Sequence, residues 1–374
     1  TVYHIVVHLK KISINIFGII KCKQMHNLSN FNYNFKKEKI MYLKKFILIL
    51  SFFVVTNFTV LNNSFGETLK ISTFVPPKHK FNTMLTQWGE TLKEKSGGEL
   101  NVEIFPSGQL GPPPRQFDLV LNGVADIAVV LHSMTPGRFP LSELAGLPFT
   151  NPKGEHSSAF SSKRLTELAN KFLLDEHKGT KILMMAVTPP LKIHTNSFNP
   201  GDFDNFEGKR IRYAGKIWKQ IVEKLGASPV PVPPAATADA MSKGVVDGAT
   251  FPYEATLPFD LAPVSKFTLE PGIASVTFAV VMSEKSYNRL SDAHKALIDE
   301  TTGANQAEAF GKVWDKVEGV GRNYMEKGGV QIITMSDSQM NSLSKLLSSV
   351  TELNIKAVND SGLPGTEFLK AFTE

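Results

Sequence analysis

Cysteine is nearly absent from this 374-residue chain, in which Cys22 is the single one. A disulfide framework is therefore excluded, and so is a cysteine nucleophile in the chain beyond residue 66. The sequence also lacks an HExxH zinc motif, a GxxxxGK[ST] phosphate loop, a GxGxxG dinucleotide turn and a GxSxG nucleophile elbow. Beyond residue 66 no two histidines fall at HxH or HxxxH spacing. We therefore expect a protein without a metal or other cofactor.

Acidic residues are missing from the first 66 positions, except for Glu38. Nine lysines and no arginine accompany it, so this segment carries a net charge of +8, whereas the 32 basic and 34 acidic residues that follow give −2. The sequence pI of about 9.1 thus comes from the leading segment. A slightly acidic body lacks the basic surface that binding to a phosphate backbone requires, and we expect no nucleic-acid partner.

The leading segment has two parts, and we expect neither to belong to the folded domain. Residues 1–40 are rich in Asn and Lys without a clear period, and we expect them to be translated from upstream of the true start. From Met41, two lysines, an apolar run over 46–55 and small residues before Glu67 predict a signal peptide over 41–66. A membrane anchor is the alternative, but the run is shorter than the roughly 20 residues that span a bilayer. The prediction is an exported protein that is not membrane-embedded after cleavage.

The chain beyond residue 66 alternates strand and helix patterns. Residues 68–75 alternate and are β-branched, 81–95 carry apolar residues at helical spacing, and 101–105 alternate again. This β-α-β order predicts a parallel sheet and an α/β fold. The same alternation continues with helices at 114–122 and 158–174 and strands at 125–131 and 181–187. At roughly 150 residues per domain, the length suggests about two domains.

An internal similarity supports two related halves. Residues 120–130 read VLNGVADIAVV and residues 241–251 read MSKGVVDGATF. Each has a glycine where a helix would end and an aspartate that enters an apolar strand. One Gly-X-X-Asp turn would mean little, but two predict topologically similar α/β lobes. Ligands bind in the crevice at the strand ends of such sheets.

Three further segments have clear local patterns. The prolines of 229–234 (PVPVPP) exclude a central strand and predict a rigid connection before a helix capped near Thr237. Residues 291–327 predict two helices or one long bent helix, because apolar residues recur at three and four and glycines interrupt them. Residues 336–358 predict another amphipathic helix.

Four segments together resemble a known family. They are FPSGQLGPPPRQFDLVLNGVADIAVV (105–130), PGRFPLSELAGLPF (136–149), FEGKRIRYAG (206–215) and KGVVDGATFP (243–252). In this order they are similar to solute-binding proteins of tripartite ATP-independent periplasmic (TRAP) transporters, of the dicarboxylate-type branch. The resemblance covers essentially the whole chain beyond the leader.

The resemblance implies a periplasmic binding protein fold with two α/β lobes, hinge-crossing strands and a long bent helix. We expect lobe I to comprise 67–188 plus 277–318, and lobe II to comprise 189–276 plus 319–374. The implied function is capture of a carboxylate-bearing molecule between the lobes, in the periplasm of a Gram-negative bacterium, and delivery to the TRAP membrane permease. No catalysis is implied. A chemosensory protein of the same fold and a periplasmic hydrolase, with Asp247 and Glu254 as its acid and base, are the alternatives.

Arg212 is the strongest candidate for ligand binding. An arginine on a short strand facing a cleft offers a planar fork of donors that matches a carboxylate. Without the resemblance, the sequence would favour a surface or lobe-stabilising role for Arg212, because exposed arginines are common. The resemblance implies that Arg212 clamps the ligand carboxylate. Arg210, on the same face of a regular strand, is the rival.

The segment KGVVDGATFP departs from the family at its end. The family often has Gln-Glu-Asn there and uses the asparagine for the ligand, whereas this chain has Phe251, which cannot form that hydrogen bond. With Tyr253 and Glu254 following, we expect an aromatic wall suited to an apolar or aromatic acid, or to a zwitterion. Core packing is an equal alternative for Phe251.

Four further residues complete the candidate ligand site. Lys192 could supply a second positive charge to a dicarboxylate, although loop lysines are usually solvated. His79 and His132 follow strands and could donate hydrogen bonds into the crevice, although lone histidines are more often structural. Trp218 opens the helix after Arg212 and is either a cleft residue or a packing residue.

Overall fold

Five strands form the first sheet, in the order β2-β1-β3-β10-β4. Their bounds are β1 Glu67–Ser72, β2 Leu100–Phe105, β3 Ile127–Leu131, β4 Thr180–Val187 and β10 Thr277–Ser283. Strand β1 pairs in parallel with both β2 and β3, which confirms the predicted β-α-β opening. Strand β10 arrives from far along the chain and runs antiparallel between β3 and β4.

Six strands form the second sheet, in the order β11-β9-β5-β8-β6-β7. Their bounds are β5 Leu191–Thr195, β6 Arg210–Arg212, β7 Ser228–Val230, β8 Gly248–Phe251, β9 Phe267–Ala274 and β11 Gln331–Thr334. The proline-rich segment enters this sheet through Pro229 of β7, at the edge. An edge is the position where a residue without an N–H donor can be accommodated.

The computed structural model describes residues 66–152 and 157–374, and these belong to a compact unit that begins at Phe65. The predictions for residues 1–40, the signal peptide and its cleavage fall on the leader, outside the described residues. Within the described part, no helix is both long enough and apolar enough to cross a membrane.

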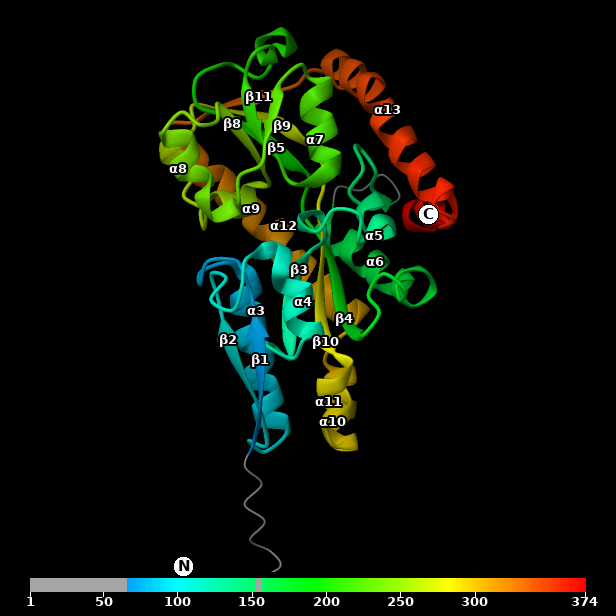
Figure 1. Cartoon of the computed structure of the whole chain (residues 1–374). Coiled ribbons are helices and arrows are strands. Elements are labelled where there is room, and N and C mark those ends of the chain that lie inside the picture. The colour runs from blue at the N-terminus through cyan, green and yellow to red at the C-terminus, as the bar shows by residue number, and fades with distance from the viewer. Residues whose placement is uncertain (1–65, 153–156) are drawn as a thin grey trace, which may run out of the picture. The chain divides into compact units, whose positions relative to one another are not determined.

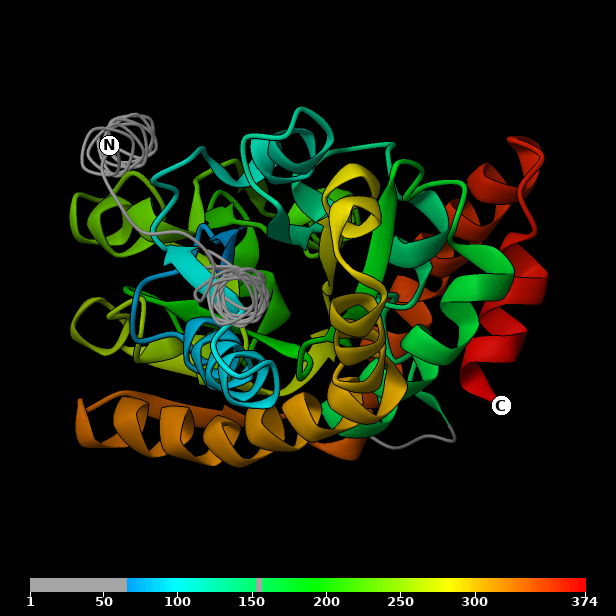
Figure 2. The ribbon, with the colours of Figure 1, turned by 90° about the horizontal axis from the view of Figure 1, so that it is seen from below.

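Two chain crossings and one long helix join the sheets into a two-lobed fold (Figure 1). The chain passes from β4 to β5 through Thr188 and returns from β9 to β10 through Val276. The crossings are hydrogen-bonded to each other, because the Thr188 N–H donates to the Val276 carbonyl (3.0 Å) and the Val276 N–H donates to the Thr188 hydroxyl (3.1 Å). Helix α12 (Ala304–Lys327) lies along one side of both lobes (Figure 2).

The helices cover the two sheets. The longer ones are α3 Lys80–Lys95, α6 Ser158–Phe172, α7 Gly215–Lys224, α11 Asp292–Glu300, α12, α13 Asp337–Asp360 and α14 Gly365–Thr373. The short ones are α4 Gln116–Leu121, α5 Pro140–Leu144, α8 Thr237–Ser242, α9 Tyr253–Thr256 and α10 Glu284–Arg289. Of the two options for 291–327, the structure has two helices, α11 and α12, and the predicted helix at 336–358 is α13. Helix α14 packs on α6 and α5.

One local prediction is wrong. Thr237 does not cap the following helix but is the first residue of α8, and its hydroxyl donates to the Pro233 carbonyl (3.2 Å). The reason is that a 3-10 turn, η5 (Pro234–Ala236), runs directly into α8 and leaves no extended capping residue.

The internal similarity appears in the structure at both helix ends. Helix α4 stops before Gly123 (φ 72°) and helix α8 stops before Gly244 (φ 67°). A left-handed conformation at this position is the usual reason for a glycine after a helix. The following aspartates repeat one arrangement. The Asp126 carboxylate accepts from the Lys70 N–H and the Asp247 carboxylate accepts from the Arg210 N–H, both at 2.8 Å.

Helix α12 approaches α6 closely at Gly311. A Cβ atom there would come within 3 Å of the backbone of Ala159 and Ser158. At Gly319, on the same helix, a Cβ would meet nothing within 4 Å.

We therefore expect Gly311→Ala to lower the free energy of unfolding by about 1–3 kcal/mol through overpacking. Gly319→Ala is the matched control and should raise it by about 0.5–1 kcal/mol, because alanine favours a helix. Urea unfolding of both variants measures the difference. Equal effects of the two substitutions would contradict the close packing of α12 on α6.

Candidate functional site

Side chains from both lobes line a narrow cavity of about 40 Å³. Strand β6 and the end of β8 contribute Arg212 and Phe251, and the loop after β1 contributes His79. Its other main lining side chains are Phe74, Glu254, Phe259 and Phe278. The cavity is thus largely apolar, with four phenylalanines, one cationic side chain and four further polar ones, His79, Thr188, Thr250 and Glu254.

Arg212 is buried in this cavity, with 1% of its surface exposed. Its guanidinium lies over the Phe251 ring, 4.3 Å from the centroid, and donates to the carbonyls of Val232 (3.1 Å) and Thr250 (2.9 Å). Burial lowers the pKa of Arg212 to about 9, so the side chain is still positively charged at pH 7. Among the described residues no carboxylate forms an ion pair with it. The cavity therefore contains an uncompensated positive charge.

Arg210, the rival candidate, precedes Arg212 by two residues on the regularly paired strand β6. Arg210 is exposed and does not line the cavity, because the Asp247 carboxylate holds its guanidinium through Nε (3.1 Å) and Nη2 (3.0 Å). The ion pair and hydrogen bonds lower the pKa of Asp247, against the opposing effect of its partial burial. Asp247 therefore pairs with Arg210 and does not line the cavity with Glu254. A hydrolase acid–base pair would need the two carboxyl groups in one site.

A row of aromatic rings forms the wall of the cavity. Phe251 contacts Phe259 at 5.5 Å between centroids, and Phe259 contacts the His79 ring at 6.2 Å. On the lobe I side Phe74 stacks on Phe278 at 6.3 Å. Aromatic walls of this kind bury flat apolar groups and orient them.

His79 and Glu254 form the polar end of the cavity, and they belong to different lobes. The His79 Nδ1 atom accepts from the Phe81 N–H (3.2 Å) at the start of α3, which places the ring proton on Nε2. Nε2 lies 3.6 Å from the Glu254 Oε2 atom. Burial lowers the pKa of His79 to about 3 and raises the pKa of Glu254 well above its usual range. The His79 ring is therefore uncharged at pH 7, and burial favours the protonated form of Glu254.

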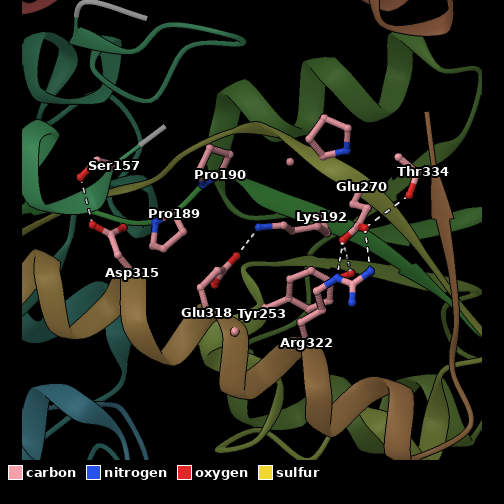
Figure 3. A pocket seen from close by; sticks show the side chains of 13 residues that line it. Ser157, Pro189, Pro190, Lys192, Tyr253, Glu270, Asp315, Glu318, Arg322 and Thr334 are labelled. Carbon is pink, nitrogen blue, oxygen red and sulfur yellow. Dashed lines mark hydrogen bonds and ion pairs between the residues drawn. The ribbon is translucent and has the colours of Figure 1, made fainter. Parts of the chain in front are cut away.

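A second, larger pocket of about 640 Å³ lies beside α12 (Figure 3). It contains two more of the predicted residues, Lys192 and Tyr253. Lys192 is paired with Glu318, and its Nζ atom lies 4.9 Å from the centroid of the Tyr253 ring. The Tyr253 hydroxyl donates to Glu270 (2.9 Å), which is also paired with Arg322. Lys192 and Arg322 are thus neutralised by protein carboxylates, unlike Arg212.

His132 and Trp218 line neither the Arg212 cavity nor the pocket beside α12. The His132 ring is buried and hydrogen-bonded to the Thr277 hydroxyl (2.8 Å) and to His177 Nε2 (3.1 Å). Trp218 is buried in α7 as part of the hydrophobic core. These placements agree with the structural alternatives considered for the two residues.

Three residues of the site are not apparent from the sequence. Phe259 and Phe278 follow no motif, and their apolar character fits any core position. Glu318 lies in a long amphipathic helix, yet its carboxylate accepts from the Glu254 N–H (2.7 Å) and pairs with Lys192. Contacts between such distant segments leave no local signal in one sequence.

The family follows from comparison with known proteins. Residues 71–356 match the family described as bacterial extracellular solute-binding protein, family 7. The chain belongs to this family. Among curated proteins, it is 24% identical over 309 residues to the outer membrane transporter protein TsaT of Comamonas testosteroni, covering 81% of this chain and 90% of that one.

Solved structures of TRAP solute-binding proteins have the same fold. One from a marine metagenome, described as specific for aromatic acid ligands and bound to 3-hydroxybenzoate, is 32% identical with a TM-score of 0.78, over 82% of this chain and 97% of that one. Another, from Rhodoferax ferrireducens with copurified benzoate, is 26% identical with a TM-score of 0.78, over 82% and 96%. The chain is thus a TRAP solute-binding protein, of the kind that captures a solute outside the cytoplasmic membrane and delivers it to a membrane permease.

The neutral state of Glu254 predicts a pH effect on the stability of this solute-binding protein. Its folded pKa lies above the unfolded value of about 4.5, so the folded state keeps a proton that the unfolded state loses as pH rises. As pH rises above about 5, and until the folded pKa is reached, the free energy of unfolding should fall, relative to Glu254→Gln, by on the order of 1 kcal/mol per pH unit. Denaturant unfolding at several pH values measures this.

Glu352→Gln, which alters an exposed carboxylate, is the control and should follow the wild-type pH dependence. If Glu254→Gln did so as well, Glu254 would be ionised in the folded protein.

Proposed function

We propose that this protein captures an aromatic monocarboxylate in the cavity that contains Arg212 and delivers it to its TRAP permease. The observation that supports this most is the buried Arg212 charge, which has no carboxylate partner among the residues that the structure describes. A buried charge is costly unless it is paired. A ligand carboxylate supplies that partner in the planar geometry that a guanidinium prefers.

The aromatic part of the ligand is inferred from the cavity wall and from the relatives. The cavity wall presents four aromatic rings, those of Phe74, Phe251, Phe259 and Phe278. A strongly polar ligand would need hydrogen-bonding groups at these positions. The two relatives with bound benzoate and 3-hydroxybenzoate bind ligands of this class, and a third from Bordetella bronchiseptica (27% identical, TM-score 0.76) binds mandelate. Lys192 is neutralised by Glu318, which favours one ligand carboxylate over two.

Binding requires the lobes to move. A cavity of roughly 150 Å³ accommodates benzene, whereas this cavity measures about 40 Å³. Both lobes line it, so an aromatic ring can enter only if they separate around the crossings at Thr188 and Val276. Ligand contacts to both lobes then stabilise the closed form, which is a shift of population between open and closed forms. We propose that the permease recognises the closed form.

We propose that lobe I comprises 67–188 plus 277–318 and that lobe II comprises 189–276 plus 319–374. All strands of the first sheet fall in the lobe I ranges and all strands of the second sheet fall in the lobe II ranges. Helices α13 and α14 of the lobe II range also contact lobe I. Helix α13 packs on α5, and Arg164 of α6 donates to the Ala371 carbonyl of α14 through Nε (2.9 Å) and Nη2 (2.6 Å).

We also infer that the protein has no hydrolase activity, because the only acid–base pair suggested by the sequence, Asp247 with Glu254, is not assembled. A sensor that reports the same ligand to a receptor would share this site, and the membership of a transporter family favours transport.

Arg212→Ala should weaken binding of benzoate and 3-hydroxybenzoate by about 2–5 kcal/mol, because the buried ligand carboxylate loses its charged partner. Isothermal titration calorimetry measures the change. Arg210→Ala is the matched control, since Arg210 is exposed and paired with Asp247, and it should leave the affinity unchanged. Unchanged binding in Arg212→Ala would refute the assignment of Arg212 as the carboxylate clamp.

Export through a cleaved signal peptide is the remaining part of the proposal. When the chain is expressed from Met41 in a Gram-negative host, we expect the periplasmic fraction to contain a protein that begins at Glu67. Mass spectrometry of that fraction determines the N-terminus. An uncleaved chain in the membrane fraction would instead show that residues 41–66 act as an anchor.

A further inference from the structure

We infer that His79 and Glu254 form a specificity subsite for a hydroxyl group, so that the cognate ligand is a hydroxylated aromatic monocarboxylate. The inference rests on the proposed function, in which Arg212 binds the carboxylate of an aromatic acid. It adds a second recognition group at the other end of the cavity wall and thereby narrows the class of ligand.

The order of contacts along the wall separates the two recognition groups. Arg212 lies over Phe251, Phe251 contacts Phe259, and Phe259 contacts the His79 ring. Two aromatic rings thus connect the guanidinium to the polar end through successive contacts. A flat ligand that places its carboxylate at Arg212 and its ring along Phe251 and Phe259 extends toward His79 and Glu254.

The polar end has unused hydrogen-bonding capacity. Glu254 Oε2 is fully enclosed and has no hydrogen-bond partner in the described part of the chain. His79 uses Nδ1 to accept from Phe81, so its Nε2–H is directed to the cavity side, and at 3.6 Å it is too far from Glu254 Oε2 for a hydrogen bond. Buried polar groups without partners are costly, and a ligand group that satisfies them is selected strongly over one that does not.

The surrounding charges determine which ligand group fits. Glu318, from α12, and Lys192, from β5, are the charged side chains that act on Glu254, and they are paired with each other. A ligand group at this end therefore meets a neutral histidine and a carboxyl whose protonated form is favoured by burial and by the neighbouring Glu318 carboxylate. Lys80 acts on His79 but does not line the cavity, and Lys192 is paired with Glu318. A second carboxylate would therefore be desolvated there without a cation in contact with it, whereas a hydroxyl accepts from His79 Nε2–H and donates to Glu254.

Matched pairs of ligands test the inference. We would titrate 3- and 4-hydroxybenzoate against the wild-type protein by calorimetry, each beside the methylbenzoate of the same ring position and beside benzoate. A methyl group fills the space of the hydroxyl but forms no hydrogen bond. We expect at least one hydroxybenzoate to bind ten or more times more tightly than its methyl analogue.

Three variants assign this preference to the two residues. Glu254→Leu and His79→Asn should each reduce the ratio of hydroxybenzoate affinity to methylbenzoate affinity to less than threefold. Asparagine at 79 retains a capping acceptor for the Phe81 N–H, so helix α3 keeps its N-cap. Glu254→Gln retains a donor and an acceptor and should keep the preference. Thermal unfolding of each variant checks that it is folded.

The outcomes separate this inference from the proposed function. If wild-type protein binds all these acids but does not distinguish hydroxyl from methyl, the subsite is wrong and the Arg212 site stands. If Glu254→Leu and Glu254→Gln weaken all ligands equally, Glu254 holds the lobes together and does not select a ligand. If none of the acids binds, the proposed aromatic carboxylate ligand is itself wrong, and this inference fails with it.

Discussion

The structure depends on a buried positive charge that its own protein does not neutralise. Arg212 is held by two backbone carbonyls and by the face of Phe251, and these contacts orient the guanidinium but do not cancel its charge. One carbonyl belongs to Val232, in the proline-rich connection, whose restricted backbone fixes the acceptor in place. The cost of this arrangement is offset only when an anion enters, which makes the cavity a site and not an ordinary part of the core.

Glu254, at the polar end of the cavity, is linked by hydrogen bonds to α12 and to the strand that follows the first crossing. Glu318 of α12 accepts from the backbone of Glu254 at the cavity and pairs with Lys192, which follows the first crossing. A carboxylate on the long helix thus contacts both the cavity lining and the hinge. Helix α12 also packs against α6 of lobe I. A ligand that displaces Glu254 would therefore act, through Glu318, on the helix that contacts both lobes.

The sequence predicted β1 to β4, most of the longer helices and the cavity residues Arg212 and Phe251, because period and motif are local properties. It did not predict β5, β9, β10, β11 or α14. Arg212 and Phe251 stand in motifs that could be compared with a family. The choice between Arg212 and its rival Arg210 was left open, because strand alternation does not reveal that Asp247 pairs with the Arg210 side chain. Lys192 was found, but its partner Glu318 was not, since the two are 126 residues apart. Pairing between distant side chains decides whether a charge is available, and one sequence does not contain that information.

Among residues 66–152 and 157–374, Arg212 is the cavity cation without a carboxylate partner, and the repeated aspartate turn explains why it is the only one. In lobe I Asp126 is paired with Arg289 of α10, and in lobe II the equivalent Asp247 is paired with Arg210 of the ligand-binding strand itself. Strand β6 therefore carries two arginines, and the turn neutralises one of them outside the cavity. Arg212 alone remains to balance a ligand, and one buried cation matches one carboxylate. The single negative charge of the proposed ligand thus follows from the Asp247 turn, which pairs with Arg210 and leaves Arg212 unpaired. The Asp126 turn in lobe I has the same arrangement.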